Sequence, residues 1–111
     1  MENDWLIILG GQYIEHYEGP SGISGNFDFN QKTTCGGVYA INSGSAWTSG
    51  KLINGPAGGN AFVLLVIPGS AYQNSRIQFV IEAKGSIFQR QLHITNPAGT
   101  TEWKQLTQGW Q

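Results

Sequence analysis

The sequence predicts an all-β domain, a compact β-sandwich or jelly-roll-like module, and three observations lead to this class. First, 16 glycines and 4 prolines punctuate the 111 residues. Second, the apolar runs between them are short and tend to alternate with polar residues, which is typical of strands. Third, charged residues make up only 12 % of the chain, about half the usual share. Because 40 % of the residues are apolar, the chain can still fill a core, and a folded domain is expected.

Residues 1–25 are expected to form an arm distinct from the domain at residues 26–111. Apolar residues 5–9 lead into Gly10 and Gly11, and apolar residues recur after them. Because a Gly-Gly pair supplies the positive φ angles of a tight two-residue turn, this segment is predicted to be a β-hairpin. A glycine-rich stretch follows and reads as a linker.

The main domain is expected to contain two strands joined by a long glycine-rich loop. The strands are predicted at residues 38–41 and 61–67, and the second is the most apolar run of the chain. The loop between them, residues 42–60, lacks the G-x-x-x-x-G-K-[ST] pattern. It also precedes a strand, whereas a phosphate-binding loop precedes a helix. Its glycines are therefore expected to let the backbone turn tightly before a buried strand.

The clearest element is a hairpin in the second half of the chain. In the segment RIQFVIEA, alternation places Ile77, Phe79 and Ile81 on one face, which is expected to be buried. A two-residue turn at residues 84–85 would put Phe79 opposite Arg90 on that face. Arg90 would then be a cation among apolar neighbours. Either its stem packs while its head reaches the edge, or its guanidinium is held for a partner carboxylate or a glycan.

Charge and composition argue against several classes of function. The net charge is −1 and no basic patch is visible, so nucleic-acid binding is not expected. No apolar run reaches the roughly 18 residues of a membrane-spanning helix, so membrane insertion is not expected. The single Cys35 excludes an internal disulfide and carries no signature of a Cys–His pair. Glu15 and His16 would point to opposite faces of a strand, and no metal or other cofactor is expected.

The acidic residues do not suggest a catalytic pair. Hydrolysis of a glycosidic bond usually needs two carboxylates about 5–9 Å apart. Glu82 is expected to be solvated on the polar face of the hairpin, and Glu102 lies near the end of the chain. The remaining candidates are Glu15, Glu18 and Asp28. No two of them form an evident pair, so the protein is not expected to be an enzyme.

Aromatic, amide and guanidinium side chains are the stronger functional signal, because sugars stack on aromatic rings and hydrogen-bond through their hydroxyl groups. Trp47 lies in a Gly/Ser loop and is either a contact for a glycan or a neighbouring chain, or a lid over the core. Tyr72, Asn74 and Arg76 belong to a second loop, which is either a ligand contact or a solvated turn. Together with Arg90 these are the candidate ligand-binding residues.

Four motifs, in order along residues 26–107, resemble the knob domain at the distal end of pyocin and bacteriophage tail fibres. FDFNQKTTCGGVYAI is similar to the family's opening, and NGP followed by GGNAFVLLVI is similar to its Asn-Gly-Pro loop and apolar strand. IFQRQL resembles the strand with an aromatic residue and an arginine, and TTEWKQL resembles the closing Trp motif. The matching positions are Asp28, Asn30, Gly37, Tyr39, Asn54, Gly55, Pro56, Phe88, Arg90 and Trp103. The family often has a second tryptophan in a W-x-x-W pattern, and this chain has Thr100 at that place.

The resemblance implies that the domain is the receptor-binding tip of a phage or phage-like tail fibre. It implies a homotrimer at the distal end of a virion fibre, with residues 1–25 as a possible end of the fibre shaft. The implied activity is non-catalytic attachment to a bacterial surface polysaccharide of the lipopolysaccharide type. The alternatives are a trimerisation or assembly module without its own ligand, and a fragment that helps a depolymerase grip its substrate. Few charges and neutral polar faces agree with a trimer, because such faces can be buried against copies of the same chain without leaving a charged group buried and unpaired.

Overall fold

The computed structural model describes residues 26–41, 44–70 and 74–107, and the all-β class predicted from the sequence is confirmed there. The strands are β1 (Phe27–Asp28), β2 (Val38–Ile41), β3 (Leu52–Ile53), β4 (Phe62–Pro68), β5 (Ser75–Glu82), β6 (Ile87–His93) and β7 (Lys104–Thr107). Three short 3-10 helices connect them: η2 (Phe29–Gln31), η3 (Gly44–Thr48) and η4 (Pro97–Gly99). The helices found in these ranges are too short to cross a membrane. The predicted arm at residues 1–25, with its hairpin, lies outside the described residues.

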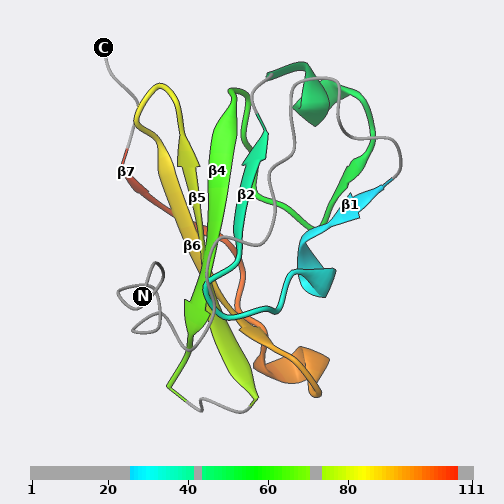
Figure 1. Cartoon of the computed structure of the whole chain (residues 1–111), viewed down its shortest axis with the longest axis vertical. Helices are drawn as coiled ribbons and strands as arrows, with labels where there is room; N and C mark the ends of the chain where they lie inside the picture. The colour runs from blue at the N-terminus through cyan, green and yellow to red at the C-terminus, as the bar shows by residue number, and fades with distance from the viewer. Residues whose placement is uncertain (1–25, 42–43, 71–73, 108–111) are drawn as a thin grey trace, which may run out of the picture.

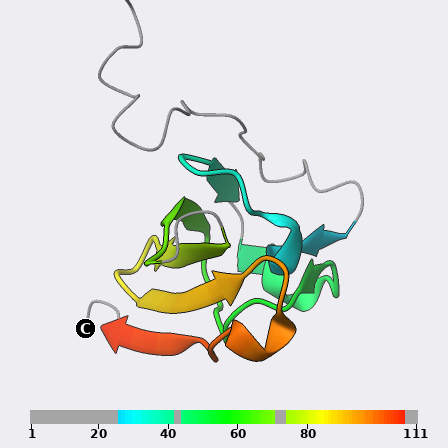
Figure 2. The same cartoon turned by 90° about the horizontal axis from the view of Figure 1, so that it is seen from below.

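The architecture consists of one large sheet and one small layer. Five strands form an antiparallel sheet in the order β2-β4-β5-β6-β7, and β1 pairs with β3 in a short parallel ladder. Figure 1 shows β1, η2 and η3 together on one side of the molecule, beyond β2. Figure 2 shows η4 at the connection between β6 and β7. The core lies between the small layer and one face of the sheet, which we call the inner face.

Aromatic side chains fill the centre of this core. Phe29, at the start of η2, is fully buried. Its ring stacks on Phe62 of β4 with centroids 5.9 Å apart and meets Trp103 edge-on at 5.7 Å. Trp47 of η3 packs against Phe62 at 4.9 Å and stacks on Phe29 at 6.2 Å. Such pairs add about 0.5–1.5 kcal/mol each beyond their buried area, so this cluster fastens the small layer to the sheet.

The hairpin of β5 and β6 differs from the sequence-based prediction by one residue. The sequence predicts a two-residue turn, but a three-residue loop joins the strands. The amide of Glu82 donates to the carbonyl of Ser86 at 2.8 Å, and the amide of Gly85 donates to the carbonyl of Glu82 at 2.9 Å. Gly85 has a φ of 96°, the left-handed conformation that closes a three-residue hairpin loop of this kind. Gln78 is consequently the residue opposite Arg90.

This shift exchanges the two faces of β5, because strand side chains alternate. Val80 and Gln78 face the core and are fully buried. The prediction that Ile77, Phe79 and Ile81 form the buried face is therefore wrong. They lie on the opposite, outer face of the sheet, where Ile81 is 40 % exposed.

Candidate functional site

Arg90 is the centre of the candidate site. It lies on the inner face of β6 and is only 6 % exposed. Its Nε donates to Oε1 of Gln78 at 2.7 Å, and its Nη2 donates to Oδ1 of Asn30 at 2.8 Å. Its guanidinium carbon lies 4.7 Å from the centre of the Trp103 ring, a cation–π contact. Arg90 thus joins the sheet, η2 and the segment before β7.

Gln78 supports Arg90 from the neighbouring strand. Its side-chain amide donates to the carbonyls of Phe29 at 2.7 Å and Lys32 at 3.0 Å, while its oxygen accepts from Arg90. A buried glutamine with all these partners is satisfied and fixes the guanidinium in one position. Sequence reasoning missed this role, because the predicted register placed Gln78 on the polar face of the hairpin.

Asp28 and Asn54 hold the loops around Arg90. Oδ1 of Asp28 accepts from the amide of Asn30, which caps η2, and from Nδ2 of Asn54, both at 2.9 Å. The carbonyl of Asn54 accepts from Nε1 of Trp103 at 2.8 Å. Residues from distant motifs, which the sequence analysis grouped only by resemblance, therefore meet in one network.

Each residue of the Asn-Gly-Pro motif has a physical reason to be there. Asn54 has a φ of 64°, which asparagine tolerates better than most residues. A Cβ on Gly55 would lie 2.5 Å from the Phe29 ring, so only glycine lets the loop approach so closely. Pro56 is buried directly after them. The motif thus packs its own loop onto the aromatic core and presents the Asn54 side chain to Asp28.

The charge of Arg90 is held in a partly desolvated place. Burial lowers the pKa of its guanidinium from its ordinary value to about 10, and the negative charge of Asp28 acts in the opposite direction. Arg90 is therefore still protonated at neutral pH. Within the described ranges, no carboxylate forms an ion pair with it.

A pocket of about 410 Å³ opens beside Arg90, a size within the range of small-ligand sites. Its lining consists of one cation, neutral polar side chains and a few apolar ones: Asn30, Gln31, Asn54, Arg90, Leu92, His93, Ile94, Pro97 and Thr100. No carboxylate belongs to this lining. We call this space the Arg90 pocket. Thr100, which stands where the W-x-x-W pattern has its first tryptophan, is one of its walls.

The turn after β6 forms the outer wall of the Arg90 pocket. Nδ1 of His93 accepts from the amide of Asn96 at 2.9 Å and from that of Thr95 at 3.3 Å. A nitrogen that accepts in this way carries no proton, so the proton of the neutral ring is on Nε2. Gly99 of η4 lies against the ring, because a Cβ there would be 2.9 Å from His93 Cδ2. His93 thus presents Nε2–H as a donor.

The structure does not gather the other predicted ligand residues around this pocket. Trp47 covers the core, as one of its two interpretations held, and its Nε1 donates to the carbonyl of Asn60 at 2.7 Å. Arg76 donates from Nε to the carbonyl of Thr33 at 2.6 Å, which ties a loop to β5. Asn74 is exposed beside β5, and Tyr72 lies outside the described residues.

Glu82 is buried rather than solvated, which corrects the sequence-based expectation. It is 5 % exposed, and its Oε2 accepts from the amides of Gly59 at 2.7 Å and Asn60 at 3.0 Å. The one-residue shift of the hairpin turns it to the inner face, where it fastens the glycine-rich loop. Among the residues that the structure places, no group of three His, Cys, Asp or Glu side chains could hold a metal ion, and Cys35 is buried.

Comparisons of the chain with family models, curated proteins and solved structures return no match. The function therefore has to be argued from the Arg90 pocket and from the motifs that meet beside it.

Proposed function

We propose that this protein is a non-catalytic carbohydrate-binding domain, the receptor-binding tip of a phage or phage-like tail fibre. Its ligand is a bacterial surface polysaccharide of the lipopolysaccharide type. The observation that carries the proposal is the Arg90 pocket, which combines a buried guanidinium with neutral hydrogen-bonding side chains. The resemblance supports it as well, because the matched residues Asp28, Asn30, Asn54 and Trp103 surround Arg90.

The lining of the pocket has the chemistry that a sugar needs. Amide groups of Asn30 and Asn54 each offer both a donor and an acceptor to hydroxyl groups. Leu92, Ile94 and Pro97 offer apolar surface for the C–H face of a sugar ring. Sites for small molecules generally combine apolar walls with a few polar groups in this way.

Attachment at a fibre tip works through repetition. In the proposed homotrimer, three copies of the pocket would face one polysaccharide-covered surface. Linked sites raise the effective concentration of the second and third contacts, so weak single sites give firm attachment. The solution mass of the full chain tests this part of the proposal directly.

Two threonine variants test the pocket. Both Thr100 and Thr101 accept a backbone N–H of β6 through Oγ1, at 3.0 Å from His93 and 2.9 Å from Gln91. Only Thr100 lines the Arg90 pocket. Thr100→Trp should fill the pocket and weaken binding to whole bacteria and purified surface polysaccharides by at least about tenfold. Thr101→Trp loses a comparable hydrogen bond and is the control. Equal binding by the two variants would remove the pocket from the proposal.

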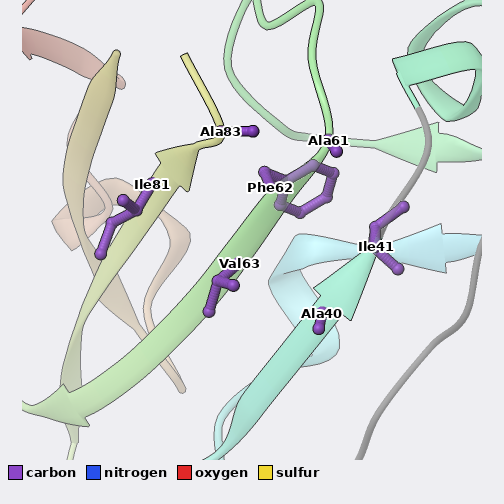
Figure 3. A pocket seen from close by; sticks show the side chains of 7 residues that line it. All are labelled: Ala40, Ile41, Ala61, Phe62, Val63, Ile81 and Ala83. Carbon is purple, nitrogen blue, oxygen red and sulfur yellow. The ribbon is translucent and has the colours of Figure 1, made fainter. Parts of the chain in front are cut away.

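A second candidate function is an assembly module without its own ligand, and the outer face of the sheet favours it. Val63 pairs with Ile81 across β4 and β5, and these side chains are 36 % and 40 % exposed. They border an apolar hollow of about 170 Å³ that Ala40, Ala61 and Ala83 also line (Figure 3). An apolar side chain of a neighbouring chain would fit there. Ile81→Asp should then lower the solution mass of the assembled protein, and an unchanged mass would exclude this face as the contact.

A further inference from the structure

Arg90 is a buried cation whose charge no described carboxylate balances at ion-pair distance. Asp28 is near enough to act on its pKa, but Oδ1 of Asp28 is engaged by Asn30 and Asn54. Burying a charge without a close counter-ion costs free energy, and an anion that enters beside it recovers part of that cost. The place for such an anion is the Arg90 pocket, because Arg90 lines it together with Asn30, the partner of its Nη2.

The guanidinium has hydrogen-bonding capacity left over. Of its five N–H groups, the described protein partners use one on Nε and one on Nη2, which leaves three. Nη1 has no protein acceptor in the described ranges. Every fully buried side-chain N or O atom in these ranges does have a hydrogen-bond partner, so Nη1 is not fully buried. Nη1 is therefore within reach of solvent. The remaining N–H groups on Nη1 and Nη2 lie in the plane of the guanidinium and are available to a carboxylate or a hydroxyl group.

The rest of the lining favours an anion over a cation. His93 belongs to the lining, and its Nε2–H remains a donor because its Nδ1 is occupied as an acceptor. Asn30, Asn54 and Thr100 are neutral. Since no carboxylate lines the pocket, an acidic ligand meets no like charge on its walls.

We propose that the Arg90 pocket recognises an acidic sugar, with the carboxylate of a uronic or similar sugar acid at Arg90 and its hydroxyl groups at Asn30 and Asn54. This inference rests on the proposed carbohydrate-binding function and goes beyond it by naming the class of sugar. A carboxylate suits the site because its charge-assisted hydrogen bonds to a guanidinium are stronger than those between neutral groups.

The test compares each bound polysaccharide with its own carboxyl-reduced form, which has neutral sugars in place of the acids. The ligands are surface polysaccharides purified from strains that bind the labelled full chain. We expect carboxyl reduction to weaken binding by at least about tenfold, the usual worth of a charged hydrogen bond. The NMR signals of Arg90 Nε–H and the His93 ring should shift only with the acidic form.

A pair of isosteric variants tests the charge without disturbing the Arg90 network. Gln31→Glu adds a negative charge to the wall of the pocket, and Gln31 is exposed. It should weaken binding of the acidic form by about fivefold and leave the reduced form unaffected. Gln89→Glu adds the same charge on the other face of β6, outside the lining of the Arg90 pocket, and should weaken binding less than Gln31→Glu does.

The outcomes separate this inference from the proposed function. If the native and reduced forms bind equally at the Arg90 pocket, the acidic-sugar inference is overturned while carbohydrate binding stands. If neither Gln31→Glu nor carboxyl reduction has an effect and the Arg90 signals do not shift, the ligand is not at Arg90. If no strain and no surface polysaccharide binds the wild-type protein, the proposed function itself is wrong.

Discussion

Replacing Gln78 with leucine tests whether the network around Arg90 holds the small layer to the sheet. Gln78 is fully buried and makes three hydrogen bonds, to the carbonyls of Phe29 and Lys32 and from Nε of Arg90. Leucine fills a similar volume but offers no polar atom, so the carbonyl of Lys32 and the charged Nε–H of Arg90 lose their partner, while the carbonyl of Phe29 keeps the amide of Lys32 at 3.2 Å. At about 1–3 kcal/mol for each of these two groups left unsatisfied, the free energy of unfolding should fall by about 2–6 kcal/mol.

Urea unfolding followed by tryptophan fluorescence measures this loss, because Trp47 and Trp103 both pack in the aromatic core. The slope with urea should stay constant, since the same surface is exposed on unfolding. Gln89→Leu, on the outer face of β6, is the matched control and should change the free energy by no more than about 0.5 kcal/mol. A cost for Gln78→Leu below about 1 kcal/mol would refute the view that the network is structurally important.

Three further predictions concern the loop and the charge. Glu82→Gln should cost about 1–2 kcal/mol of unfolding free energy, because two charge-assisted bonds to backbone amides of the loop are weakened; wild-type stability would show that water replaces them. Gly55→Ala should cost about 1–3 kcal/mol, because its Cβ would overlap the core, whereas a Cβ at Gly59 meets nothing within 4 Å; thermal unfolding of both variants checks the contrast. Because the folded-state pKa of Arg90 is lowered to about 10, the folded protein binds fewer protons than the unfolded chain between about pH 10 and 12.5, so Arg90 makes stability rise with pH there. Arg90→Met should lack this contribution. The difference between the urea midpoints of the wild-type protein and the variant should therefore change between about pH 9 and about pH 11. A constant difference would contradict the prediction.

The fold class and most strand positions followed from the sequence, because short alternating runs between glycines leave few other structures. The strand predicted at residues 61–67 is β4, Phe62–Pro68, and the strand at 38–41 is β2. The faces of the last hairpin could not be assigned from the pattern alone. The alternation points to Ile77, Phe79 and Ile81, but the face that is buried carries Val80 together with the polar Gln78 and Glu82. The length of the turn determines which face of β5 is buried. Lys84-Gly85 is compatible with both a two-residue turn and a three-residue loop, so the sequence does not settle that length.

The candidate site was only partly predictable for a related reason. Arg90 stood out in the sequence as a cation on an apolar strand, and the structure buries it. Its partners Gln78 and Asn30 lie 12 and 60 positions away, so no local pattern connects them to it. Glu82 was missed because a polar residue on an alternating strand ordinarily faces solvent. Only the register shows that its carboxylate turns inward to the loop amides.

The contact between Trp103 and the Asn-Gly-Pro loop has a consequence for the order in which the protein matures on the ribosome. Trp103 supplies both the ring over Arg90 and the donor to the carbonyl of Asn54. A nascent chain exposed only as far as residue 100 therefore has the sheet strands through β6 but not the side chain that closes the loop onto the guanidinium. The Arg90 pocket can take its final shape only after Trp103 has joined the fold.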